Sequence, residues 1–204
     1  SDSKVIESFM KMLLGGKDRS KRLRFASMEK TGAETGLNLD FDSVLDGKPG
    51  KLRLSKVVDA GAIKEIQTGE TSDLLEKGEF TTDVVAVDSA EKISGEITLP
   101  KNGKVTAVMK FPRWDFNAFS CASSWEFAKI PFADSDGYIT FNVDGFSAYA
   151  GADITVINVQ SYPVIGGQWK VNFTTIGKAD LTIHAVDGTT WSQNGLGTDL
   201  RFLE

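Results

Sequence analysis

The sequence predicts a mostly β protein built of two immunoglobulin-like or β-sandwich units, with a short peripheral N-terminal helix. Three observations predict this fold. Short segments in which apolar and polar residues alternate recur along most of the chain, which is the pattern of half-buried strands. Gly, Asn and Asp residues that favour turns separate these segments. Strands at this density favour antiparallel sandwiches over a parallel α/β fold.

We expect three parts along the chain: an N-terminal helix and basic linker at residues 1–36, a β-sandwich domain at 37–150, and a smaller immunoglobulin-like domain at 151–204. In the first part, apolar residues from Val5 to Leu14 follow helical spacing, and two glycines then end the pattern. The run Lys17 to Arg24 is rich in Lys and Arg. This amphipathic segment either packs on the sandwich or docks on a membrane surface or a partner.

In the second part, alternation predicts a hairpin whose arms are 37–42 and 51–58, joined by the turn 47–50. The segment 59–78 is ambiguous, because short stretches of it fit helical turns. A second strand-turn-strand unit has Asn102-Gly103 at its tip. The remaining strands of these units and of the closing segment are expected at 80–87, 92–99, 104–111, 138–143 and 146–150.

In the third part, strands are expected at 154–159, 169–173, 179–186 and 199–203. The short link Gly151-Ala152-Asp153 leaves little slack, so we expect the two units to pack at a restricted angle.

Composition excludes several classes of function. A net charge of -5 and a pI near 5.0 argue against a general nucleic-acid binder. The longest apolar runs fall far short of the ~20 residues of a membrane-spanning helix, so we expect no transmembrane segment. The single cysteine, Cys121, forms no internal disulfide and is expected to be a small buried apolar residue. The single histidine, His184, falls on the polar face of a strand, and we expect neither a resident cofactor nor catalysis.

Two local patterns are candidates for binding sites. Seven aromatic residues between Phe111 and Phe132 are expected to pack over one end of a core, but the alternative is an exposed platform on which Trp114 and Trp125 stack against sugar rings. Asp134 and Asp136, followed by a glycine, match the start of an oxygen-rich calcium loop. The later ligands of such a loop are missing, and a pair of acids in a cleft for glycoside hydrolysis is not indicated either.

The block from Phe111 to Glu204 carries a collective set of motifs: Trp114-Asp115-Phe116, Ile130-Pro131-Phe132, Phe141-Asn142-Val143, Phe146-Ser147-Ala148-Tyr149-Ala150, Asn158-Val159-Gln160-Ser161-Tyr162-Pro163, Ala179-Asp180-Leu181-Thr182-Ile183, and Gly188-Thr189-Thr190-Trp191. On these residues the block resembles β-sandwich modules of large secreted and cell-surface proteins of uncultured archaea and bacteria. The resemblance implies an extracellular, repetitive, structural role. Such modules are rich in N-glycosylation sites, whereas only Asn172 heads an Asn-x-Thr triplet here. Their pattern also continues past Glu204, so we expect the last unit to be incomplete or completed by a neighbour.

We therefore expect a non-enzymatic extracellular structural protein, such as a surface-layer, pilus-like or filament subunit, whose partners are copies of itself or other surface proteins. Unpaired strands present rows of N–H and C=O groups to a neighbour, and the expected pairing strands are Leu37–Asp42 and the terminal residues Leu200, Arg201, Phe202 and Leu203. The alternative is a carbohydrate-binding or adhesion module whose glycan ligand stacks on Trp114 and Trp125.

Overall fold

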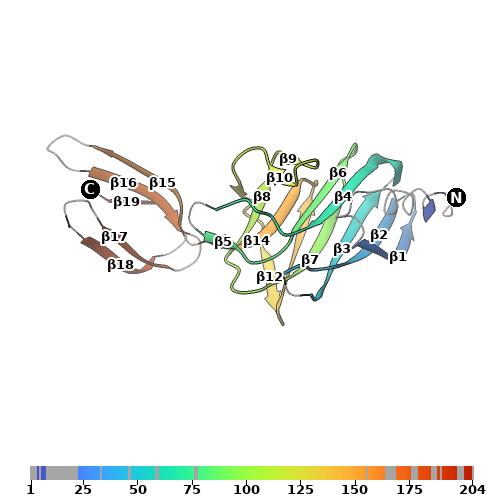
Figure 1. The fold of residues 1–204 in the computed structure, drawn as a ribbon, viewed down its shortest axis with the longest axis horizontal. Helices are drawn as coiled ribbons and strands as arrows, with labels where there is room; N and C mark the ends of the chain where they lie inside the picture. The colour runs from blue at the N-terminus through green and yellow to red at the C-terminus, as the bar shows by residue number, and fades with distance from the viewer. Residues whose placement is uncertain are drawn as a thin grey trace.

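The computed structural model describes residues 4, 6–7, 23–32, 34–45, 47–57, 60–75, 78–154, 156–163, 169–175, 179–184, 188, 190–196 and 200–203. Within this part of the chain the fold is mostly β, and two antiparallel sheets form a β-sandwich, which confirms the predicted fold class (Figure 1). The helix expected between Val5 and Leu14 falls almost wholly outside the described residues.

Each main sheet has six strands. The first has the order β1 (Leu23–Thr31), β2 (Glu34–Asp42), β3 (Pro49–Val57), β7 (Ser94–Pro100), β13 (Tyr138–Asp144) and β12 (Phe132–Ser135). The second has the order β11 (Glu126–Phe127), β8 (Ala107–Phe111), β14 (Ala148–Ile154), β6 (Val84–Ser89) and β4 (Ile63–Gly69), with β5 (Gly78–Phe80) paired to β14. A 3-10 turn, η2 (Ala60–Ala62), precedes β4.

The main core lies between the two sheets. In β2, Leu37, Leu39 and Phe41 are buried while the residues between them are more exposed, as their alternation predicts. Val85, Val108 and Tyr149 lie in the same core and come from the second sheet. The predicted hairpin is confirmed, because β2 pairs with β3 in antiparallel register from Thr35 opposite Val57 to Asp42 opposite Pro49.

The outer face of the second sheet is buried as well. Alanines on this face form a shallow floor, and the segment from Pro112 to Phe127, with the short strands β9 (Trp114–Asp115) and β10 (Ser120–Cys121), lies over it. The floor includes Ala86, Ala107, Ala148, Ala150 and Ala152. Because both faces of the sheet are covered, Val84 to Val87 of β6 are all buried and show no alternation.

The structure differs from the expected boundaries at both ends of the sandwich. Residues 23–31, expected to be part of a linker, form β1, because Leu23, Phe25 and Met28 face the core while the residues between them are exposed. At the other end, β14 runs through to Ile154, so Gly151 to Asp153 lie within a strand rather than in a link. Position 151 requires a small residue, because the Gly151 backbone packs closely against the side chains of Ile139 and Thr82.

The segment around Asn102-Gly103 joins two sheets rather than two arms of one hairpin. β7 belongs to the first sheet and β8 to the second. The crossing chain is held by backbone hydrogen bonds from Asn102 N to Thr81 O (2.8 Å) and from Thr106 N to Ala152 O (2.9 Å). Of the two turn residues only Gly103 has a positive φ, whereas a tight type I′ hairpin needs it at both. An Asn-Gly pair thus marks a turn without showing which strands it joins.

Beyond Ile154 the chain forms two small sheets that share no strand with the sandwich. Strands β15 (Val156–Pro163), β16 (Trp169–Thr175) and β19 (Leu200–Leu203) form one sheet in that order, and β17 (Ala179–His184) pairs with β18 (Thr190–Leu196) in the other. Figure 1 shows both sheets at the chain's C-terminal end. Four of these five strands overlap the expected segments, whereas β18 was not predicted.

Candidate functional site

Four of the aromatic residues that the sequence singles out pack with Phe80 in one group, here called the aromatic cap: Phe80, Phe111, Trp114, Phe119 and Trp125. Phe111 is fully buried at its centre and contacts the rings of both tryptophans. The Trp114 ring meets Phe111 and Phe119 edge to face, each at a centroid distance of 5.0 Å, and Trp125 lies 4.4 Å from Phe80. Such edge contacts add to the area that each ring buries. The cap is therefore a second hydrophobic core on the outside of the second sheet.

A buried glutamine ties the cap to strand β4. The side chain of Gln67, only 1% exposed, donates hydrogen bonds to Glu65 Oε1 (2.6 Å) and to Phe116 O (2.7 Å). Its Oε1 accepts the indole N–H of Trp114 at 3.1 Å. Because the indole N–H of Trp114 is bonded to Gln67 and its ring packs against Phe111, Phe119 and Trp125, these contacts give no support to a sugar platform at Trp114. Sequence reasoning missed Gln67, since nothing in the pattern of β4 marks it as buried.

The chain's one cysteine, Cys121, and its one histidine, His184, lie in different sheets. Cys121 is half-buried beside the cap, its backbone N–H donates to Asp73 Oδ2 (2.9 Å), and its sulfur lies 3.6 Å from Ser123 Oγ. His184, at the end of β17, is exposed, and its Nδ1 lies 3.2 Å from Thr190 Oγ1. The structure therefore does not bring these two residues together as a thiol dyad.

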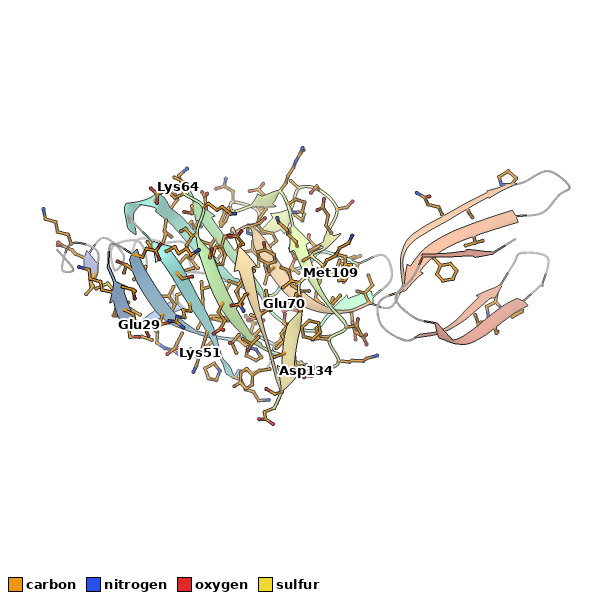
Figure 2. All side chains as sticks on the ribbon, turned by 180° about the vertical axis from the view of Figure 1, so that it is seen from behind. Glu29, Lys51, Lys64, Glu70, Met109 and Asp134 are labelled. Carbon is orange, nitrogen blue, oxygen red and sulfur yellow. The ribbon has the colours of Figure 1, made fainter. Side chains whose placement is uncertain are left out.

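The two aspartates of the calcium hypothesis lie on the β12–β13 hairpin, where Figure 2 labels Asp134. Asp136 and Gly137 are its two turn residues, and both have positive φ (50° and 81°), as a type I′ turn requires. Asp134 forms an ion pair with Lys101, whose Nζ lies 2.5 and 2.6 Å from the two carboxylate oxygens. The Lys101 side chain is only 17% exposed. Among the described residues, no group of three or more His, Cys, Asp or Glu side chains is arranged to hold a metal ion. The aspartates thus have structural roles in a turn and an ion pair.

This geometry predicts that calcium does not stabilise the protein. Adding millimolar CaCl2, or removing trace metal with EDTA, is expected to leave the melting temperature unchanged in differential scanning fluorimetry, whereas Asp134→Asn lowers the free energy of unfolding by about 1 kcal/mol or less because the ion pair is partly exposed. A calcium-dependent rise in melting temperature that Asp134→Asn and Asp136→Asn remove would restore the calcium site.

Two edge strands of the sandwich, β1 and β4, carry features that discourage pairing with another chain. On the described part of the chain, β1 pairs with β2 alone, but it carries a bulge between Phe25 and Ser27 and the exposed ion pairs Arg24–Asp42 and Arg53–Glu29. At the opposite sheet edge, β4 is covered near its end by the bond from Gln67 to Phe116. Bulges, charges and covering segments all discourage edge-to-edge pairing. The expectation that Leu37–Asp42 is an edge strand is wrong, since β2 lies between β1 and β3.

The C-terminal sheets have fewer neighbours. Within the described residues, β19 pairs only with β16, from Leu200 opposite Thr174 to Leu203 opposite Val171, and the other sheet is a single hairpin. Asn172, the candidate glycosylation residue, lies in the middle of β16, with Gln160 of β15 and Phe202 of β19 as its backbone neighbours. Its neighbour Phe173 is fully buried.

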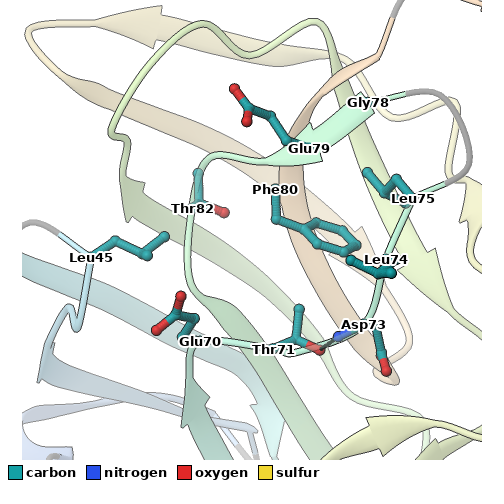
Figure 3. Close-up of a pocket in the computed structure, with 10 residues that line it drawn as sticks. All are labelled: Leu45, Glu70, Thr71, Asp73, Leu74, Leu75, Gly78, Glu79, Phe80 and Thr82. Atoms are coloured by element: carbon teal, nitrogen blue, oxygen red, sulfur yellow. Dashed lines mark hydrogen bonds between the residues drawn. The ribbon is translucent and has the colours of Figure 1, made fainter.

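A pocket of about 160 Å³ lies where β5 meets the segment that follows β4 (Figure 3). Figure 3 shows the Phe80 ring between Leu74 and Leu75 on one side and Leu45 and Glu70 on the other. Glu70, Asp73 and Glu79 contribute carboxylates, and none of the ten residues that line the pocket is Lys or Arg. The sequence alone does not indicate this pocket, because its walls come from three segments that are separate in the chain.

Taken together, fold and geometry define an antiparallel β-sandwich with a covered outer face, followed by two small sheets of three and two described strands. No protein-family model, curated protein or solved structure matches the chain. No helix in the described part of the chain is long and apolar enough to cross a membrane.

Proposed function

We propose that the chain is a non-enzymatic structural subunit of an extracellular or cell-surface assembly, and that copies associate through a strand edge of the three-stranded C-terminal sheet. The observation that carries the proposal is the small size of the C-terminal sheets: β15, β16 and β19 form one, and the β17–β18 hairpin forms the other. Isolated hairpins are marginally stable in water, and a sheet gains stability from added strands. A strand supplied by a neighbour would provide them.

β19 is the strand proposed to pair across the interface. Three of its four residues are apolar, and among described strands it has one neighbour, β16. An edge with these properties offers backbone hydrogen bonds to another chain. Of the edge strands of the sandwich, β1 by contrast carries a bulge and ion pairs, and β4 lies beside a covering segment. The resemblance to modules of surface proteins supports the extracellular setting.

The test is the oligomeric state of the full chain over a wide concentration range. We expect ordered oligomers in electron microscopy, and a molar mass that rises with concentration in size-exclusion chromatography with light scattering. Deleting residues 200–204 is expected to return the chain to monomers, because it removes the pairing strand.

The exposed β18 residue Thr190 provides a matched control. Thr190→Lys changes a strand residue outside the three-stranded sheet and is expected to leave assembly unchanged. Circular dichroism of the deleted chain checks that the sandwich stays folded. A wild-type chain that remains strictly monomeric at high concentration would refute the assembly.

A further inference from the structure

The most exposed large apolar side chain of the described residues lines the pocket. Leu74 is 92% exposed, and Leu45, Leu75 and Phe80 line the same hollow. A single solvent-exposed leucine is ordinary, but an exposed leucine that lines a hollow with other apolar side chains indicates an interaction site.

Internal contacts fix the pocket in shape. The carboxylate of Asp83, which is fully buried, accepts the backbone N–H of Val44 at 2.8 Å and so anchors one wall. Asp73 anchors the opposite wall through its bond to the Cys121 N–H (2.9 Å), and Thr71 Oγ1 accepts the Asp73 N–H (3.1 Å). The floor is Phe80, which packs on Trp125 and Phe111 of the aromatic cap. A preformed pocket loses less entropy when a partner binds.

The rim is acidic. Glu70 and Glu79 are exposed at the pocket, and the ion pairs among the described residues involve neither of them. Carboxylates around an apolar floor favour a ligand whose apolar groups enter the hollow while its cationic groups stay at the rim.

The same chain contains a segment with this chemistry. Residues 4–22, KVIESFMKMLLGGKDRSKR, hold six Lys or Arg against two acids, and the apolar run Met12-Leu13-Leu14 lies beside them. In Figure 1 β1, whose first residue directly follows this segment in the sequence, lies at one end of the sandwich, and β5, which forms part of the pocket, lies at the other. An interaction between these two ends joins copies head to tail, and such heterologous contacts extend into open chains.

We infer that the acidic-rimmed pocket around Phe80 and Leu74 receives the basic, apolar segment 4–22 of a second copy. The inference rests on the proposed function, because it names the second contact between neighbours in the assembly. β19 supplies backbone pairing, and the pocket supplies charge and apolar complementarity.

A direct test measures binding of a fluorescent peptide of residues 4–22 to the full chain by anisotropy. Glu70→Gln/Glu79→Gln is expected to weaken binding about tenfold or more, and Leu74→Ser to weaken it to a similar extent. Raising NaCl from about 0.05 M to about 0.5 M weakens binding to the wild type because salt screens exposed charges.

The matched control is Glu34→Gln/Glu91→Gln, which removes the same charge from two exposed positions away from the pocket and is expected to leave binding unchanged. A peptide with every Lys and Arg replaced by Gln is expected not to bind. The inference is overturned if the wild type does not bind the peptide at low salt, or if both pocket variants bind it as the wild type does.

Sedimentation velocity then separates this inference from the proposed function. If the pocket variants assemble normally while deletion of residues 200–204 abolishes assembly, strand pairing stands and the pocket contact is refuted. If the deletion has no effect while the pocket variants dissociate the assembly, strand pairing is refuted. A concentration-independent monomer refutes both, since an intermolecular contact must respond to concentration.

Discussion

Phe111→Ala is expected to lower the free energy of unfolding by about 3–5 kcal/mol. Phe111 is fully buried, and its ring contacts Trp114, Trp125 and Phe80. It lies on the alanine floor, with Ala148 of β14 as its backbone neighbour. Removing the ring leaves a cavity between two layers that cannot collapse easily, because the alanines below are already small. Urea denaturation followed by tryptophan fluorescence and by circular dichroism measures the change.

Phe116→Ala is the control for this prediction. Phe116 packs beside the aromatic cap, but its side chain is partly exposed, and its bond with Gln67 uses the backbone oxygen that alanine retains. Its loss is expected to cost less than half as much as that of Phe111. If the two substitutions cost the same, the aromatic cap is not centred on Phe111.

The cap also shows what the sequence revealed and what it did not. Dense aromatics between Phe111 and Phe132 correctly predicted a packed group, because rings of this size rarely stay in water when they are clustered. Its place could not be predicted. Ala148, Ala150 and Ala152 line this face, and alanine occurs on both buried and exposed strand faces. The sequence therefore does not indicate that a further layer lies on it.

β2, β3 and β13 were predicted because one face of each meets water, and alternation of apolar and polar residues records that asymmetry. β4 failed this test, because it is buried nearly throughout its second half and gives no period of two. β1 failed for another reason, since the basic run that includes Arg24 obscures the inward-facing Leu23 and Phe25.

Pairing was harder to predict than strands. The segments before and after Asn102-Gly103 were both recognised, but their assignment to one hairpin was wrong because local turn chemistry does not record which sheet each arm joins. The pocket escaped for the same reason, since the β2–β3 turn, the segment after β4 and β5 meet only in the folded chain.

Gly151→Ala is expected to lower the free energy of unfolding by about 1–3 kcal/mol, although alanine is a conservative change at most strand positions. Gly151 is buried in β14, where its N–H donates to Thr82 Oγ1 (2.8 Å) and its carbonyl accepts the Thr81 N–H (3.0 Å). A Cβ there would lie 2.8 Å from Ile139 Cδ1 and 2.9 Å from Thr82 Cγ2. The strand is held by its hydrogen bonds on both sides and cannot move away to relieve the overlap.

A double-mutant cycle tests that cause directly. Ile139→Val removes the Cδ1 atom and alone costs about 0.5–1.5 kcal/mol, so the pair Gly151→Ala/Ile139→Val is expected to cost less than the two single changes added together. Gly36→Ala is the matched control, because Gly36 also lies in a strand but a Cβ there meets nothing closer than 3.7 Å. Its effect is expected to be neutral or slightly stabilising, since alanine restricts the unfolded chain. Strict additivity in the cycle would show that contact with Ile139 is not what requires glycine at position 151, and chemical denaturation of the four chains measures it.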